Sequence, residues 1–374
     1  MKIGTLSVNI NTPDYNYGAL LHSYAFIEYL KKLDFVEHAE VIDYITPYVL
    51  TKKREWVVPK EYARNNFRDY FTLKRMKHSF KVRDKKFKKF IKKNMTVSKK
   101  QYLQDSLKSE KFDYDTLVCE SDVIWSPLLT GGKLDPAFFL SFNNMKSIKK
   151  IAYSPSIGDN IYDKQQEKDL KKYLKSLDFI SCRESYAKDI LEKYTDKKIT
   201  HVLDPVMLLD ESNFNKITGP KLSKEKYILL YLPVNDNKKL RKQAKEFAQK
   251  YNYKIIEIST KLIKMKSKMH ITLPDAGIEE FLSGIKYADY VFTNSLHAVC
   301  FSIIFKKQFY AFSRKYAGKV KDVCEIFGLS KRFFPTDEFV EQKDIDYDKV
   351  YKKYYKLKEK SEKYILNALM SKKN

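Results

Sequence analysis

Short apolar runs alternate with longer segments of helical spacing along this chain. Ile3–Val8 has the pattern of a strand, and Gly18–Leu33 follows with apolar residues at three- and four-residue steps, which predicts a helix. The alternation continues, with further predicted strands at residues 41–45, 114–119, 150–153, 179–182, 201–203, 227–232, 254–258 and 290–292. Strands that alternate with helices indicate parallel sheets, so the predicted fold class is α/β.

A polar stretch at residues 211–224, which contains a Gly-Pro pair, separates two such series. We therefore expect an N-terminal Rossmann-like domain at 1–215 and a C-terminal one at 216–374, the latter ending in a Lys/Tyr-rich helix. Two doubly wound Rossmann-like domains that face each other across a cleft form a GT-B-like plan. A fold of this kind does not by itself give a function.

Residues 52–100 differ from the rest of the first domain and predict a basic helical insertion. Between Phe71 and Lys100 there are 13 Lys/Arg and one acid, Asp84, and apolar residues recur at helical steps. One interpretation is a surface helix with a solvated Lys face. The other is docking to an anionic membrane surface or a polyanionic acceptor.

Composition adds a net charge of +25. A basic excess of this size suggests an anionic partner, although AT-rich coding bias also produces it. No RNA- or DNA-binding signature is present, so we expect no specific nucleic-acid partner. The four cysteines form no CxxC, no signal-peptide layout opens the chain, and no apolar run is long enough for a membrane span. These features predict a cytoplasmic protein, and the basic segment 52–100 adds the hypothesis of peripheral contact at the inner face of the membrane.

The candidate chemistry lies where predicted strands end in polar residues. In open α/β sheets, ligands bind at the carboxyl ends of strands, beside helix N-termini. One such elbow runs from Thr293 through Asn294 and Ser295 to His297, between an apolar run and a helix. Its imidazole is a candidate for proton transfer, and the alternative is a core histidine bonded to backbone.

Six of these segments, in order, resemble motifs of the polysaccharide pyruvyl transferase family. The resembling stretches are Asn16-Tyr17-Gly18-Ala19-Leu20-Leu21, Ser121-Asp122-Val123-Ile124-Trp125-Ser126-Pro127, Ala152-Tyr153-Ser154-Pro155-Ser156-Ile157-Gly158, Ser181-Cys182-Arg183-Glu184, Leu203-Asp204-Pro205-Val206-Met207-Leu208-Leu209 and Thr293-Asn294-Ser295-Leu296-His297 with Phe301-Ser302-Ile303. The chain departs from the family pattern at four positions. Glu120 and Ala298 stand where Gly is usual, Asn294 where Asp is usual, and His22 where Gln is common.

The resemblance implies transfer of a pyruvyl group from phosphoenolpyruvate to a sugar, with formation of a ketal and loss of phosphate. The implied acceptor is a surface polysaccharide unit or a lipid-linked oligosaccharide precursor. The resemblance implies no metal or nucleotide cofactor, with phosphoenolpyruvate as the donor substrate.

Ketal formation requires a proton donor, a base for the hydroxyls and fixed groups for the anionic donor. With the resemblance, His297 is the expected catalytic proton donor. Asp122, at the end of a strand, is the second expected catalytic residue, either orienting a sugar hydroxyl or acting as the base, and its alternative is capping of the next segment. Arg183 matches a carboxylate or phosphate bidentately, and its alternative is a structural salt bridge. Further expected substrate-binding residues are Asn16, Tyr17, Gly18, Ser121, Ser154, Ser156, Asn294 and Ser295.

The sequence leaves three local alternatives and two other function classes open. Asn16 to Gly18 could form only a turn and helix cap, Trp125 could be core and not a platform for a sugar ring, and Asp204-Pro205 favours a structural role. A nucleotide-sugar glycosyltransferase of GT-B type would share the fold, but the glycines of the second half form no phosphate-binding loop. A non-catalytic polyanion-binding protein acting through residues 52–100 is the third class.

Overall fold

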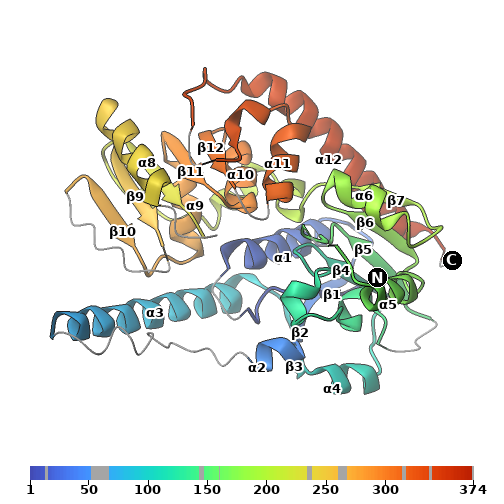
Figure 1. Cartoon of the computed structure of the whole chain (residues 1–374). Helices are drawn as coiled ribbons and strands as arrows, with labels where there is room; N and C mark the ends of the chain where they lie inside the picture. The colour runs from blue at the N-terminus through green and yellow to red at the C-terminus, as the bar shows by residue number, and fades with distance from the viewer. Residues whose placement is uncertain are drawn as a thin grey trace. The chain divides into compact units, whose positions relative to one another are not determined.

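The chain forms two compact α/β units. The structure is a computed structural model and describes residues 1–12, 16–51, 67–142, 147–159, 161–233, 238–259, 268–313, 317–336 and 339–372. Unit 1 comprises residues 1–53, 91–209 and 351–374, and unit 2 comprises 54–90 and 210–350. Figure 1 labels their helices and strands.

Unit 1 is built on a seven-stranded sheet in the order β3-β2-β1-β4-β5-β6-β7. Every pair of neighbouring strands in it is parallel. The strands are β1 (Lys2–Leu6), β2 (His38–Tyr44), β3 (Val97–Tyr102), β4 (Thr116–Glu120), β5 (Lys149–Tyr153), β6 (Phe179–Cys182) and β7 (Ile199–His201).

Helical elements cover both faces of this sheet. Successive residues of a strand point to opposite faces. Ala152 of β5 belongs to a core cluster with Leu170, whereas the ring of Tyr153 stacks on Phe26 at 4.9 Å and contacts Tyr364 at 6.3 Å. The elements are α1 (Tyr17–Leu30), α2 (Pro47–Thr51), α4 (Gln104–Ser109), η2 (Pro127–Thr130), η3 (Pro136–Phe139), α5 (Lys164–Leu174), α6 (Ser185–Leu191), η4 (Pro205–Leu208) and α12 (Tyr347–Met370), of which the first four residues group with unit 2.

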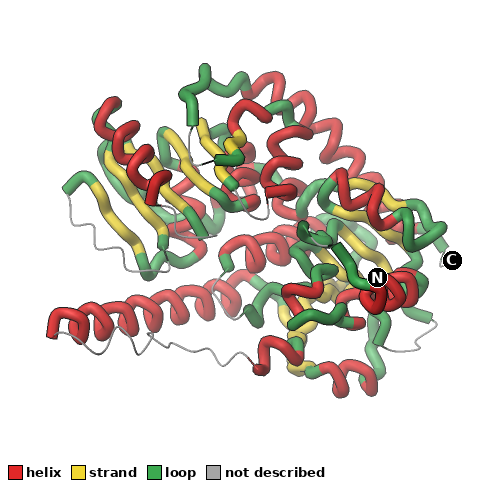
Figure 2. Tube along the Cα trace, in the orientation of Figure 1, coloured by secondary structure: helices red, strands yellow, loops and turns green. Residues whose placement is uncertain are grey.

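Unit 2 contains a six-stranded parallel sheet in the order β10-β9-β8-β11-β12-β13. Its strands are β8 (Tyr227–Tyr231), β9 (Lys254–Ile258), β10 (His270–Leu273), β11 (Tyr290–Thr293), β12 (Gln308–Phe312) and β13 (Phe333–Phe334). Its helical elements are α7 (Glu211–Asn215), α8 (Lys238–Lys250), α9 (Ile278–Lys286), α10 (Leu296–Ile304), α11 (Ala317–Ile326), η5 (Ser330–Arg332) and most of α3 (Phe67–Asn94). Figure 2 shows how helices flank the strands in each unit.

The sequence pattern explains how α8 packs. Leu240, Ala244, Phe247 and Ala248 are buried, and their four-, three- and one-residue steps place them on one face of the helix. They join a core cluster that includes Phe292 of β11. The predicted fold class, α/β with two Rossmann-like domains, is confirmed by the two parallel sheets, and the cleft remains a prediction.

The predicted basic helix differs from the observed structure at its end. Helix α3 ends at Asn94, and residues 97–102 form the edge strand β3 in place of a helical continuation. Three consecutive exposed residues of this strand, at 99–101, make it polar enough to resemble helix surface in the sequence. Residues 52–66 of the expected insertion lie outside the described part of the chain.

The buried side of α3 packs within unit 2. Arg83 is fully buried, and its Nε donates to the carbonyl of Ala276 at 3.2 Å. Lys86 forms an ion pair with Glu280. Side chains at 81, 85, 88 and 89 are exposed, which agrees with a helix that has one packed and one solvated face.

The compact units differ from the expected division at 215/216 in two segments. Residues 54–90 group with unit 2, and 351–374 group with unit 1. The C-terminal helix bonds there through side chains. Tyr354 donates to the carbonyl of Met207 at 2.8 Å, and the Ser361 hydroxyl accepts from the amide of Leu203 at 2.9 Å.

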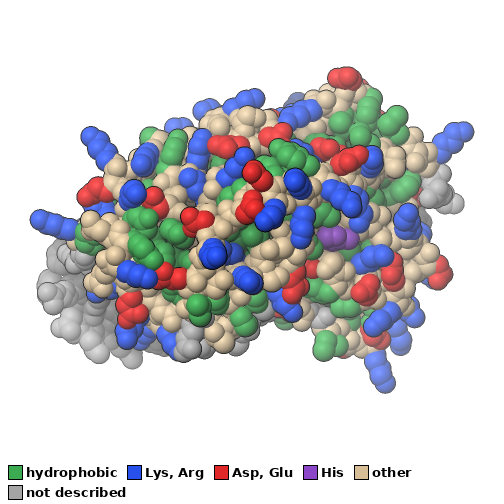
Figure 3. All heavy atoms as spheres, turned by 90° about the horizontal axis from the view of Figure 1, so that it is seen from above, with side chains coloured by type: hydrophobic (Ala, Val, Ile, Leu, Met, Phe, Trp, Pro, Cys, Tyr) green, Lys and Arg blue, Asp and Glu red, His purple; other side chains and the backbone are tan. Residues whose placement is uncertain are grey.

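Figure 3 shows Lys and Arg side chains scattered over the face in view, with Asp and Glu among them. Across the described part of the chain, no helix is long and apolar enough to cross a membrane. The four cysteines, Cys119, Cys182, Cys300 and Cys324, are buried free thiols.

Candidate functional site

Three residues at the carboxyl ends of β4 and β5 have left-handed backbone conformations. Ser121, Asp122 and Ser154 have φ values of 50°, 51° and 60°. Such conformations in residues other than Gly cost on the order of 1 kcal/mol each and persist where the surroundings enforce them. Among the described residues, six that are not glycine have a positive φ, and three of these six lie in the two loops that follow β4 and β5.

Backbone hydrogen bonds join the two loops and account for this conformation. The amide of Ser121 donates to the carbonyl of Tyr153 at 2.9 Å, and the amide of Ser156 donates to the carbonyl of Asp122 at 2.8 Å. The Oγ of Ser154 is buried and has no hydrogen-bond partner among the described residues. These loops bring together the predicted residues Ser121, Asp122, Ser154 and Ser156, all of them buried.

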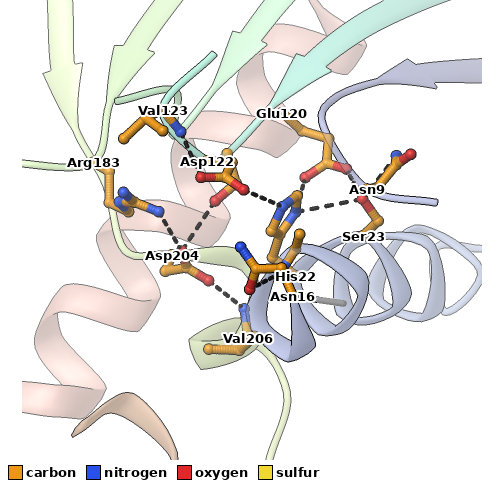
Figure 4. A network of polar contacts seen from close by, with 12 residues as sticks. Asn9, Asn16, His22, Ser23, Glu120, Asp122, Val123, Arg183, Asp204 and Val206 are labelled. Atoms are coloured by element: carbon orange, nitrogen blue, oxygen red, sulfur yellow. Dashed lines mark hydrogen bonds and ion pairs between the residues drawn. The ribbon is translucent and has the colours of Figure 1, made fainter. Parts of the chain in front are cut away.

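A buried ion pair lies beside these loops. Glu120, the last residue of β4, and His22 of α1 are both fully buried, with 2.7 Å between Oε2 and Nδ1. Ser23 donates its hydroxyl to the other oxygen of Glu120, and Asn9 donates its side-chain amide to Ser23 at 3.1 Å. Figure 4 shows this chain of contacts from Asn9 to His22.

His22 lies between two carboxylates. Its Nε2 is 3.9 Å from Oδ2 of Asp122, on the opposite side of the ring from Glu120. Burial alone would lower the pKa of His22, but the charge of Glu120 and hydrogen bonds to Asp122 and Glu120 raise it to about 10. The imidazole is therefore a cation at neutral pH.

Asp122 has two different oxygens. Oδ1 accepts a hydrogen bond from the amide of Val123 at 2.7 Å, which is the capping contact considered as the alternative to a catalytic role. Oδ2 faces His22. The side chain is 10 % exposed, so the carboxylate is fixed on one side and retains limited access to solvent.

Arg183 forms the salt bridges considered as its alternative. Nε donates to Oε1 of Glu184 at 2.9 Å, and Nη1 donates to Oδ2 of Asp204 at 3.1 Å. The same Asp204 oxygen accepts from the hydroxyl of Ser121 at 3.0 Å, which ties Arg183 to the β4 loop (Figure 4).

This site in unit 1 is acidic overall. Its charged groups are the carboxylates of Glu120, Asp122, Glu184 and Asp204 and the cations of His22 and Arg183. An excess of carboxylates favours polar hydroxyl groups over a multiply charged anion. The arrangement suits hydrogen-bonding or deprotonation of a hydroxyl.

The expected motif at the start of α1 has the geometry of a helix cap. Asn16 is the N-cap, and its Oδ1 accepts from the amide of Ala19 at 3.2 Å. Tyr17 is 1 % exposed and Gly18 is buried, while Asn16 itself is exposed. The turn-and-cap alternative is thus present, and a substrate role for these residues stays a prediction.

The loop between β11 and α10 forms a separate candidate site in unit 2. Thr293 is fully buried, and its Oγ1 donates to the carbonyl of Tyr231 at 2.7 Å and accepts from the amide of Ser295 at 3.0 Å. Ser295 caps α10 by accepting from the amide of Ala298 at 3.4 Å.

His297 is the second residue of α10 and is 8 % exposed, and Asn294 is half-buried beside the cap. Ala298 is an ordinary helical residue, so the helix needs no glycine there. The helix N-terminus favours anions.

Sequence reasoning missed several residues of the unit 1 site. Asp204 was expected to be mainly structural, and its Oδ1 does cap η4 by accepting from the amide of Val206 at 3.1 Å, but the link of its Oδ2 with Ser121 and Arg183 was not foreseen. His22 and Glu120 stood out as departures, but their contact could not be inferred. Trp125 is fully buried and stacks on Phe139 at 5.0 Å, which confirms the core interpretation.

In the described ranges, no group of three or more His, Cys, Asp or Glu has the arrangement to hold a metal ion.

The chain is similar to known proteins in sequence and in fold. A family profile described as polysaccharide pyruvyl transferase matches residues 16–316. No curated protein matches the sequence at a significant level. Solved structures of similar fold cover nearly the whole chain. A co-structure of S. aureus MnaA with UDP has a TM-score of 0.50 at 12 % identity and covers 100 % of this chain and 99 % of its own.

The second structure is UDP-GlcNAc 2-epimerase from Neisseria meningitidis bound to UDP-GlcNAc. It has a TM-score of 0.49 at 11 % identity and covers 99 % of this chain and 95 % of its own. At such identities, the likeness to MnaA concerns the fold alone, and it agrees with two Rossmann-like domains.

Proposed function

Since the chain belongs to the polysaccharide pyruvyl transferase family, we propose that it transfers a pyruvyl group from phosphoenolpyruvate to a sugar of a surface polysaccharide or of its lipid-linked precursor. The observation that carries this proposal is the family match over residues 16–316, a range that includes all six motif segments. Membership makes the protein a pyruvyltransferase enzyme. The donor, the ketal product and the lipid-linked acceptor are the proposed refinements.

The proposed reaction adds two sugar hydroxyls to C2 of phosphoenolpyruvate. Protonation of the methylene carbon C3 generates cationic character at C2, which the first hydroxyl attacks. Phosphate then leaves, and the second hydroxyl closes the ketal. Two protons leave the hydroxyls, of which one is balanced by the new methyl group and the other by the released phosphate. The enzyme must therefore supply an acid and a base.

In this proposal the unit 1 site acts on the acceptor hydroxyls. Asp122 accepts a hydroxyl proton through Oδ2, because Oδ1 is already bonded to the amide of Val123. His22, held by Glu120, fixes the orientation of this carboxylate. The surplus of carboxylates supports an acceptor role and disfavours phosphoenolpyruvate as the ligand of these groups.

Arg183 has a positioning role in the same proposal. Its guanidinium bonds to Glu184 and Asp204, and Asp204 in turn accepts from Ser121. Arg183 therefore maintains the left-handed turn that presents Asp122. Direct binding of the donor by Arg183 would require exchange of at least one of these buried ion pairs, which is costly.

The β11–α10 loop acts on the donor. The N-terminus of the nine-residue helix α10 offers backbone N–H groups and a favourable dipole for the phosphate or carboxylate. Asn294 and Ser295 add hydrogen bonds at the same turn, and His297 delivers the proton to C3. This assignment rests on the family motif and on the position of His297 in the first turn of α10.

The proposal is tested by incubation of the purified chain with phosphoenolpyruvate and glycan or lipid-linked glycan fractions. The expected result is acceptor-dependent phosphate release together with acid-labile pyruvate in the glycan. His297→Gln and Asp122→Asn should each lower the rate of both signals by a factor on the order of 10² or more, while His78→Gln, which changes an exposed histidine, should retain them. Absence of phosphate release from folded wild-type protein with every acceptor fraction would refute the proposed donor.

A further inference from the structure

A basic hollow in unit 1 lies apart from the site described above. Its volume is about 640 Å³, and it is lined by the start of β6, by the whole of β7 with the two lysines before it, by Lys188 of α6 and by the second half of α12. The loops that hold Ser121, Asp122 and Ser154 follow the carboxyl ends of β4 and β5. In Figure 1, α6, β6, β7 and α12 lie side by side, in agreement with this lining.

The lining is strongly cationic. It contains five lysines and one acid, namely Lys188, Lys197, Lys198, Lys360, Lys363 and Asp178. Asp178 is already engaged, because its Oδ2 accepts from the amide of Lys150 at 2.8 Å. The lining side chains, taken by themselves, therefore carry more positive than negative charge, which favours an anionic ligand.

Some of these lysines are compensated and others are not. Lys188 pairs with Glu192 at 3.5 Å, and Lys363 pairs with Glu359 at 2.5 Å. Within the described part of the chain, neither Lys198 nor Lys360 forms an ion pair with an acid. Both are exposed at the hollow, so their charges are available to a ligand.

Lys197 is bonded to backbone and not to an acid. Its Nζ donates to the carbonyl of Lys175 at 2.9 Å, and among the described residues no carboxylate contacts this ammonium group.

His201 supplies a second, independent observation. Its Nε2 is buried and has no hydrogen-bond partner among the described residues, although its side chain lines the hollow. Burial, followed by the charge of Lys360, lowers the pKa of His201 to about 4, so the ring is neutral in the free protein. A buried polar atom without a partner is uncommon and indicates a place that a ligand or water can satisfy.

The geometry points to a binding site for a phosphate-bearing ligand in this hollow. A volume of about 640 Å³ is larger than a lone phosphate requires and falls in the range of sites for small organic molecules. Phe179 and Tyr364 add half-buried aromatic walls. The ligand class is therefore a phosphate ester with an organic body, whether a free sugar phosphate or the headgroup of an anionic lipid. The inference does not depend on the pyruvyl-transfer proposal.

His201 gives the direct readout. Inorganic pyrophosphate is titrated into histidine-labelled full-length protein while the imidazole resonances are followed by NMR. The facing charged groups are Lys360 and Lys363 of α12, Lys188 of α6, Lys197 and Lys198 before β7, and Asp178 before β6. Added phosphate charge favours the imidazolium, so the pKa of His201 should rise from about 4. A saturable shift of its signal is the expected result.

Matched variants test whether the hollow is responsible. The double variant Lys198→Gln/Lys360→Gln should weaken pyrophosphate binding on the order of tenfold, because two uncompensated charges are removed. Lys353→Gln/Lys356→Gln removes two exposed lysines of α12 that do not line the hollow, and it should bind as wild type does. Equal binding by both double variants, or an unchanged His201 signal, would overturn the proposal.

A second arm identifies the source of the phosphate. Vesicles of phosphatidylcholine alone are compared with vesicles that also contain phosphatidylglycerol, in co-sedimentation with the same two double variants. Binding that needs the anionic lipid and is lost in Lys198→Gln/Lys360→Gln assigns the site to a lipid headgroup. Pyrophosphate binding without vesicle binding assigns it to a free phosphate ester.

Discussion

Nδ1 of His22 lies 2.7 Å from Oε2 of Glu120, and both side chains are fully buried. These are two of the four positions at which the sequence departs from the family pattern, and the departures compensate each other. A carboxylate at residue 120 alone would place an unpaired charge in the core, which is strongly unfavourable. When His22 is protonated, its positive charge balances that of Glu120, so the pair has no net charge. The Nε2 side of the same imidazolium faces Asp122.

Breaking this pair should cost far more than breaking an exposed one. We expect His22→Gln and Glu120→Ala each to lower the free energy of unfolding by about 3–5 kcal/mol, since each leaves one buried polar partner without its counterpart. The double variant should lose clearly less than the sum of the single losses. Denaturant unfolding of the four proteins in the cycle measures this.

The matched control is His38→Gln. His38 also pairs with a glutamate, Glu40 at 3.4 Å, but its side chain is 45 % exposed. Its loss should change the free energy of unfolding by at most about 0.5 kcal/mol. Strictly additive effects of His22→Gln and Glu120→Ala would show that the two side chains do not interact.

The same pair predicts a pH dependence of stability. The pKa of His22 is raised from 6.5 to about 10 by the fold, so the folded state holds this proton more tightly than the unfolded state does. Its contribution is complete below pH 6.5 and is lost as the pH rises through about 10. Between pH 6.5 and about 10, the free energy of unfolding of wild type should therefore fall more than that of the double variant His22→Gln/Glu120→Ala, which lacks this pair. Parallel pH profiles of unfolding for the two proteins would contradict the assignment.

Asp122→Asn separates chemistry from folding. The amide can still accept from Val123, so we expect little change in stability. If Asp122 is the base, kcat for pyruvyl transfer should fall by a factor on the order of 10²–10⁴. Asp163→Asn is the control, because Asp163 caps α5 through the same kind of contact and lies outside both candidate sites. Full activity of Asp122→Asn would show that Asp122 is not the base.

Arg183→Ala should act first on folding. It leaves the buried carboxylates of Glu184 and Asp204 without their cation, and the expected loss is about 3–5 kcal/mol in the free energy of unfolding. Adding Asp204→Asn should recover part of this loss. Lys188→Ala, which breaks an exposed pair on α6, is the control with an expected change within about 0.5 kcal/mol. Unchanged stability of Arg183→Ala would contradict the structural role.

The sequence predicted the parts of this structure that follow from local periodicity. Parallel strands bring their carboxyl ends to one edge of a sheet, so the loops that hold Ser121, Asp122, Ser154 and Arg183 could be expected together. The contact of His22 with Glu120 joins residues 98 positions apart, and no spacing rule encodes it. The left-handed conformations of Ser121, Asp122 and Ser154 also gave no signal, because none of these three residues is glycine.

Two predictions that differ from the structure, those for β3 and for the C-terminal helix, also have physical causes. Strand β3 is an edge strand with three consecutive exposed residues, so it continues the charge pattern of α3 and resembles a helix. A helical period also cannot tell on which sheet a helix packs. The C-terminal helix was therefore expected with the second domain, whereas Tyr354 and Ser361 bond to residues of unit 1.

The measurement that tests the central claim most directly is calorimetric titration of phosphoenolpyruvate into wild type, His297→Ala and His78→Ala. His297 lies in the first turn of α10, and His78 is an exposed histidine of α3 in the same unit. The account predicts saturable binding to wild type and His78→Ala, and binding weakened at least on the order of tenfold in His297→Ala. Folded wild type that does not bind phosphoenolpyruvate, or equal affinity in all three proteins, would contradict it.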